Sequence, residues 1–137
     1  MKNLTEIEKG WIAGIMEGEG SLKWNEKGSS QGQIRLQLQM TDKDVVEKLA
    51  NLLETNITEH LPKNPKHKKT WRISIKNWDK VEEIAKTLLP YMGNRRTEEY
   101  SLVLEKAEKR KEWIAQGGRN IAWKRKRNND GSWEKND

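Results

Sequence analysis

The 137-residue sequence contains no cysteine and no apolar run long enough to cross a membrane. Without cysteine, disulfide bonds and cysteine-ligated zinc sites are excluded. The two histidines, His60 and His67, lie in a lysine-rich stretch, and we interpret them as solvated loop residues. The first residues, MKNLTEIEKG, lack the apolar segment of a signal peptide. We therefore expect an intracellular protein (phage- or bacterial-cytoplasmic, or organellar) with no membrane partner.

Acidic residues are also in deficit. The sequence has 21 Asp and Glu against 27 Lys and Arg, which gives a net charge of +6. Because only 33% of residues are hydrophobic, the chain can build one modest core. A basic domain of this length is typical of proteins that bind a polyanion, most often nucleic acid. Charge alone is equally compatible with a soluble basic protein that has no such partner.

The patterning predicts an α+β domain over residues 1–117 and a basic tail over residues 118–137. Thr5 and Glu8 form a capping box, so a first helix should begin there and run to about Glu17. A second helix should be capped by Thr41 or Asp42. Strands are expected at 21–24, 33–40, 57–61 and 70–76, and the later helices at the segment ending at Pro90 and at 97–116. The order α-ββ-α-ββ-α-α predicts a four-stranded antiparallel sheet with helices on one face.

The first helix contains an unusual stretch, WIAGIMEGEGSL, at residues 11–22. Gly10, Gly14 and Gly18 share one helical face, with Ala13 beside them. A face without side chains lets another helix approach closely, although tight packing on the chain's own sheet is the alternative. Glu17 and Glu19 stand at the negative end of the helix dipole, where a carboxylate is disfavoured unless it binds a cation. Two solvated surface acids are the simpler interpretation of this pair.

Residues 12–20, IAGIMEGEG, resemble the LAGLIDADG signature of homing endonucleases, and the predicted element order resembles that family's α-ββ-α-ββ-α fold with its saddle-shaped sheet. The resemblance covers roughly residues 5–105. It implies that motif helices of two copies pack together through Gly10, Ala13, Gly14 and Glu17. Since only one motif copy is present, the expected assembly is a homodimer on a roughly palindromic duplex.

The resemblance also implies site residues. Glu19, with the Gly18 carbonyl as a helper, would hold a divalent metal, Mg²⁺ or Mn²⁺. Glutamate replaces the family's commoner aspartate there. Asp42 would orient a water, or would only cap the second helix. Arg95 would lie near the scissile phosphate, with Arg96 one position away. The implied activity is metal-dependent cleavage of both strands of double-stranded DNA at a specific site.

The strands supply side chains suited to reading bases. Arginine pairs with guanine, and glutamine or asparagine pairs with adenine, in the major groove. Alternation places such groups on one strand face, although an ordinary wet surface has the same alternation. The predicted DNA-binding residues are Lys23, Asn25, Gln33, Arg35, Gln37, Gln39, Lys69, Arg72, Ser74 and, in the tail, Arg125.

Two other functions remain open at this point. A protein of the same family type that splices RNA as a maturase, or that binds DNA without cutting it, would have the same fold. An unrelated RNA-binding domain would need exposed aromatic residues on the sheet, whereas Trp71 alternates with isoleucines on the apolar side. The tail from Arg119 is interpreted either as a solubilising segment or as an arm along the DNA backbone.

Overall fold

The computed structural model describes residues 3–25 and 32–117. In chain order the elements are α1 (Glu6–Glu19), β1 (Gly20–Asn25), β2 (Gln33–Met40), α2 (Lys43–Leu53), β3 (Thr58–His60), β4 (Thr70–Ile75), α3 (Trp78–Leu88), the short 3-10 helix η1 (Leu89–Tyr91) and α4 (Asn94–Ala115). This is the predicted element order, and the predicted α+β class is confirmed.

The helix ends follow local chemistry. At the start of α1, the Thr5 hydroxyl accepts a hydrogen bond from the Glu8 N–H, and the Glu8 carboxylate accepts one from the Thr5 N–H. Asn77 caps α3 by accepting from the Lys80 N–H at 3.0 Å. Pro90 cannot continue the α-helical ladder, so α3 passes into η1. Helices α1 and α3 therefore begin where a side chain satisfies a free backbone N–H, and α3 ends next to a residue that lacks one.

Three details differ from the sequence-based expectations. Helix α1 continues two residues past Glu17, because the Gly20 N–H still donates to the Met16 carbonyl. Helix α4 begins at Asn94 rather than at residue 97, with the Thr97 N–H bonded to the Gly93 carbonyl. Asp42 occupies the N-cap position of α2, but its side chain makes no capping hydrogen bond there.

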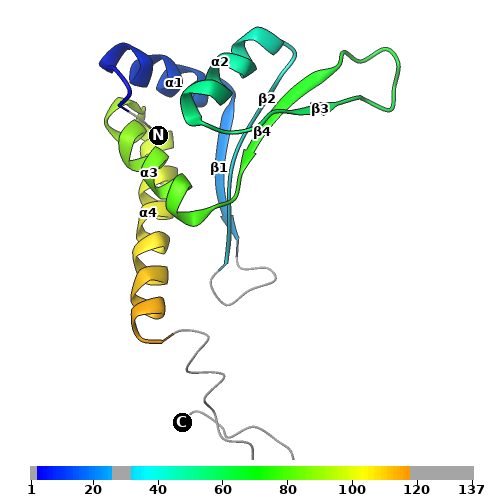
Figure 1. The fold of residues 1–137 in the computed structure, drawn as a ribbon. Coiled ribbons are helices and arrows are strands. Elements are labelled where there is room, and N and C mark those ends of the chain that lie inside the picture. Colours follow the sequence, from blue (N-terminus) through cyan, green and yellow to red (C-terminus); the bar gives the residue numbers. More distant parts are fainter. Residues whose placement is uncertain (1–2, 26–31, 118–137) are drawn as a thin grey trace, which may run out of the picture.

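The sheet has the order β1-β2-β4-β3, and all neighbouring strands are antiparallel. All the helices lie on one side of it, and β3 and β4 reach beyond them (Figure 1). The long helix α4 runs beside α3 (Figure 1). The C-terminal end of α4 lies at the same end of the molecule as the last residues of β1 and the first residues of β2 (Figure 1). The sheet thus keeps one side clear of the described helices.

The core fills the space between the sheet and the helices. Leu38 and Ile73, which are register partners on β2 and β4, point into it together with Ile12 and Met16 of α1. Tyr100 of α4 is also fully buried, and burial holds the pKa of its hydroxyl well above the usual value. No helix within the described ranges is both long and apolar enough to cross a membrane.

Candidate nucleic-acid interface

The sheet side without helices is lined by polar side chains. The register places Lys23 opposite Arg35, Gln37 opposite Ser74, and Gln39 opposite Arg72, which puts each pair on one face. The side chains on this face, together called the polar face, are Ser21, Lys23, Asn25, Gln33, Arg35, Gln37, Gln39, Thr58, His60, Thr70, Arg72, Ser74 and Lys76.

None of these described positions is acidic. The one acid within the strands, Glu59, lies opposite Trp71, whose alternation with Ile73 and Ile75 places it on the helix-covered side. The polar face therefore combines several cations with amides and hydroxyls and with no carboxylate. Such a surface attracts an anionic polymer and can form paired hydrogen bonds with it.

One end of the polar face is held together by hydrogen bonds. Arg72 donates from Nε at 3.0 Å and from Nη2 at 2.8 Å to the same oxygen, Oε1 of Gln39. The Gln39 amide in turn donates to Oγ1 of Thr70 at 2.6 Å. Because Gly20 lies opposite Leu38, this cluster is at the end of the sheet where Glu19 stands. Gln39, Thr70 and Arg72 are called the near end.

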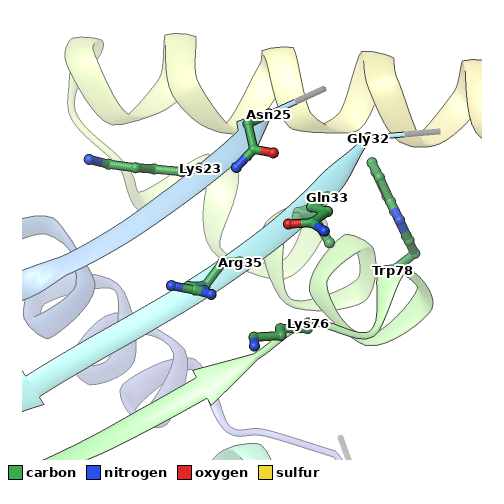
Figure 2. A pocket seen from close by; sticks show the side chains of 8 residues that line it. Lys23, Asn25, Gly32, Gln33, Arg35, Lys76 and Trp78 are labelled. Atoms are coloured by element: carbon green, nitrogen blue, oxygen red, sulfur yellow. The ribbon is translucent and has the colours of Figure 1, made fainter. Parts of the chain in front are cut away.

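The other end is an open hollow of about 370 Å³. Figure 2 shows that Lys23, Arg35 and Lys76 come from three neighbouring strands or their ends, and that Trp78 stands at one side. Within the described part of the chain, no ion pair or hydrogen bond engages the side chains of these three cations. The residues Lys23, Asn25, Gln33, Arg35 and Lys76 are called the far end.

The C-terminal end of α1 exposes one of its two acids, Glu19. Gly18 and Glu19 are both exposed, and the last turn of the helix contains no basic residue. The positive charge that offsets the negative end of the α1 dipole comes from α4. There, Nε and Nη2 of Arg96 each lie 3.3 Å from the Glu17 carbonyl oxygen. The motif end of α1 is therefore tied to the start of α4, while the Glu19 carboxylate remains accessible.

Arg95 was the predicted site residue, and Arg96 was the alternative one position away. Arg96 is only 9% exposed and pairs with Glu99 at 2.9 Å in addition to its contact with Glu17. Arg95 is exposed on the first turn of α4, so it can reach outward. The sequence could not separate two adjacent arginines, because which one faces α1 depends on how α4 packs.

On the outer side of α1, the three glycines leave a stripe without side chains. Gly10, Gly14 and Gly18 are exposed, and a Cβ added at any of them would meet nothing within 4 Å in the described chain. Ile7, on the same stripe, is 85% exposed. The alternative in which these glycines pack α1 tightly on the chain's own sheet is therefore not what the structure shows, and the stripe is open to another molecule.

Two residues expected at that contact face inward instead. Ala13 is 2% exposed and belongs to the chain's own core, so it offers almost no surface to a second chain, and its assignment to a dimer contact stays a prediction. Glu17 points toward α4, since a Cβ added at Gly93 would lie 2.6 Å from its Oε1. Its other oxygen, Oε2, is buried and has no hydrogen-bond partner among the described residues. The side of α1 that bears Ala13 is thus the one packed on the core.

The remaining predicted residues have varied surroundings. Asp42 is exposed at the start of α2, so it can reach a ligand.

Lys69 forms an ion pair with Glu59 and lies 5.8 Å from the centre of the Trp71 ring, which reduces its availability to DNA. Lys63, Lys66 and Lys68 are exposed on the β3–β4 loop. Arg125 and the basic tail lie outside the described residues.

A divalent metal would find only part of a site in one chain. Across residues 3–25 and 32–117, no three acidic, histidine or cysteine side chains come together. What one chain offers is the exposed Glu19 carboxylate next to the exposed residue Gly18. Carboxylate and carbonyl oxygens are the ligands that Mg²⁺ prefers, so the donor type fits, and the other ligands would come from elsewhere.

No protein-family model and no curated protein matches the sequence. Solved structures do match the fold. The DNA complex of the group I intron-encoded homing endonuclease I-CeuI matches with a TM-score of 0.63 and 15% identity, covering 90% of this chain and 65% of that one. The LAGLIDADG homing endonuclease I-SmaMI, bound to cleaved DNA, matches with a TM-score of 0.59 and 19% identity, covering 88% of this chain and 43% of that one.

A third match is the homing endonuclease I-CvuI, crystallised with DNA in the presence of Mg. Its TM-score is 0.58 at 15% identity, and the match covers 75% of this chain and 67% of that one. At these identities the comparisons establish the fold, and the chain has the fold of the LAGLIDADG homing endonucleases.

Proposed function

We propose that this chain is a site-specific DNA endonuclease that acts as a homodimer and requires a divalent metal. The observation that carries the proposal is the joining of two features in one molecule. An acid-free polar face runs along the sheet, and an exposed glutamate stands at its near end, beside an α1 stripe without side chains. The structural neighbours that were solved as DNA complexes support a DNA partner.

The sheet would bind the duplex. A β-strand rises about 3.4 Å per residue, which is close to the spacing of base pairs along DNA. The six-residue separation of Gln33 and Gln39 on β2 therefore spans roughly six base pairs. Side chains on one face of a strand are two residues apart, so those of one strand can contact about every second base pair in the major groove, while the exposed lysines of the β3–β4 loop would contact phosphates.

The α1 stripe would join two chains. Close approach of helices is favoured where glycine removes the side chains between them, and Gly10, Gly14 and Gly18 offer such a surface. Two-fold packing through this stripe would bring two Glu19 carboxylates to one centre. Each sheet would then read one half of a roughly palindromic site.

The chemistry would take place at that centre. Glu19 and the Gly18 carbonyl would hold Mg²⁺ or Mn²⁺, which when bound supplies an activated water and stabilises charge on the phosphate. Asp42, exposed at the start of α2, would orient the attacking water. The exposed guanidinium of Arg95 would stabilise the additional negative charge on the phosphate. The Arg96 contact with the Glu17 carbonyl would keep the end of α1 in place during this step.

The experiment that tests this function starts from a pool of randomised DNA duplexes. The protein is used to select bound duplexes in Ca²⁺, and the selected duplex is then incubated with Mg²⁺. We expect an enriched, roughly palindromic sequence and cleavage of both strands. Enrichment without cleavage would favour a non-cleaving DNA-binding protein, and enrichment from a matched RNA pool alone would favour a maturase.

A further inference from the structure

At the near end of the polar face, the donor and the acceptor of each hydrogen bond can be assigned. An arginine side chain carries only donors, so the group of Gln39 that faces Arg72 must be its amide oxygen. The amide nitrogen of Gln39 therefore faces Thr70, whose hydroxyl accepts at 2.6 Å. Since Thr70 and Arg72 belong to β4 and Gln39 to β2, the two strands fix all three side chains together.

This order removes Gln39 from the residues that can read adenine. Recognition of adenine needs both the amide oxygen and the amide nitrogen of a glutamine. Here the oxygen already accepts two hydrogen bonds from Arg72, and the nitrogen donates to Thr70. The sequence-based expectation of an adenine contact at this position is therefore replaced by a different role for Gln39.

The same hydrogen bonds leave several N–H donors of Arg72 available to a ligand. A guanidinium has five N–H donors, and Gln39 occupies one on Nε and one on Nη2. Among the described residues, no group engages the two N–H groups of Nη1 or the second N–H of Nη2. They form the outer fork of the side chain, the geometry that matches O6 and N7 of guanine. Arg72 is only partly exposed, and with two of its donors fixed it loses little conformational freedom on binding.

We infer that Arg72 recognises one guanine in each half of the DNA site, and that Gln39 is a positioning residue that holds the Arg72 fork toward the major groove. This inference depends on the proposed function, because it needs a bound duplex. It places the guanine close to the cleaved bond, since Gln39 follows the Leu38–Gly20 pair next to Glu19. Two-fold symmetry then requires the guanine at equivalent positions of both half-sites.

The test uses duplexes selected in Ca²⁺ by the full chain and by variants. Wild type should enrich guanine at one symmetric pair of positions. Arg72→Lys keeps the charge but loses the fork, so the preference at that pair should fall by roughly 5- to 150-fold. Preferences elsewhere and the salt dependence of binding should stay unchanged, because the number of positive charges is the same.

The positioning role of Gln39 is tested separately, by the effect of its substitution on the guanine preference. Gln39→Ala removes the acceptor and should reduce the guanine preference in the same direction. Gln39→Glu restores an acceptor oxygen for Arg72 and should restore the preference, although the added negative charge weakens binding to all duplexes. Asn51→Ala is the control, because Asn51 is an exposed amide residue on α2, outside the polar face, and its removal should leave the guanine preference unchanged.

The outcomes separate the inference from the proposed function. A wild-type protein that enriches no duplex sequence would overturn both. A wild type that enriches a sequence, with an unchanged profile in Arg72→Lys, would overturn the inference alone. So would a Gln39→Ala effect that is fully additive with that of Arg72→Lys, because a positioning residue has nothing left to position once the fork is gone.

Discussion

The two ends of the polar face use the same residue types in different ways. At the near end, glutamine, threonine and arginine are bonded to one another across two strands. At the far end, lysines and an arginine from neighbouring strands surround an open hollow without ion pairs among the described residues. The near end is preorganised beside Glu19, whereas the side chains of Lys23, Arg35 and Lys76 at the far end are not held by any ion pair or hydrogen bond among the described residues.

This difference indicates how recognition would be divided along the sheet. Fixed donors discriminate between bases, because a wrong base leaves them unpaired. Cations that contact phosphate position the protein on the duplex but carry little sequence information. We therefore expect strict sequence preference and cleavage to depend on the near end, and sequence-independent affinity to depend on the far end.

The largest effect is expected from Glu19→Gln, at the near end. The substitution keeps the shape of the side chain but removes the charge that would hold metal, so the cleavage rate should fall by at least roughly 100-fold. Affinity for the selected duplex in Ca²⁺ should stay within a few-fold of wild type. The matched control is Glu98→Gln, an exposed glutamate on α4. Normal cleavage by Glu19→Gln would remove Glu19 from the site.

The next largest effect should come from Gly14→Leu on the outer stripe of α1. The new side chain meets open space within its own chain, and leucine has a higher helix propensity than glycine by about 1 kcal/mol. The monomer should therefore remain folded, while the two helices are forced apart. Sedimentation should show loss of the dimer, and cleavage should be lost with it.

Ser101→Leu, at an exposed position of α4, is the control for adding an apolar side chain to a helix surface. It should leave the sedimentation of the protein unchanged. A Gly14→Leu protein that still forms dimers would show that the stripe is not the contact between chains.

A smaller, sequence-independent effect is expected at the far end. Changing Lys23, Arg35 and Lys76 to glutamine should weaken binding to all duplexes and lower the slope of log affinity against log salt by up to about three units. The preference near the cleavage positions should remain. The same change at Lys43, Lys48 and Lys109, on the helix side, should leave the slope near its wild-type value. Equal slopes for the two triple variants would contradict a phosphate-binding far end.

The smallest effect should come from a residue remote from both ends. Glu82 of α3 is buried and pairs with Lys111 and, at 2.8 Å, with Lys86. Burial raises the pKa of its carboxyl, but the hydrogen bonds from the two lysines outweigh burial and bring the pKa below 4.5. Its stabilisation is therefore present above pH 4.5 and is lost as the pH falls through the lower pKa of the folded state.

Glu82→Gln should thus reduce the free energy of unfolding by about 1 kcal/mol at pH 7 and by much less at low pH. Denaturant unfolding at the two pH values measures this directly. DNA affinity and cleavage should be unchanged. A stability loss that is the same at both pH values would show that packing, and not charge, accounts for the contribution of Glu82.

The sequence predicted the element order because local signals set it. The Thr5 capping box, the alternation of residues 33–40 and Pro90 each act within a few residues, and each was confirmed. The composition of the polar face was predictable for the same reason. Alternation assigns a side chain to a face regardless of which strand lies next to it.

The division of the polar face into two ends could not be predicted in this way. The bond between Gln39 and Arg72 joins residues 33 positions apart and depends on the register of β2 with β4. Likewise, Arg96 rather than Arg95 contacts α1, and Ala13 turns into the core, because of how the helices pack. Such contacts depend on how the helices and strands pack. The local sequence does not show which of two neighbouring residues makes them.

The most direct test of the account is the affinity of the wild-type protein for a series of duplexes, each with one base pair of the selected half-site replaced. Measured in Ca²⁺ across the whole half-site, the series gives the sequence preference at every position. We expect losses of about 1–3 kcal/mol at positions closest to the cleaved bonds, including the guanine contacted by Arg72, and smaller losses toward the far end. A flat profile, or one with its largest losses at the outer base pairs, would contradict the division of the sheet into a discriminating near end and an adaptable far end.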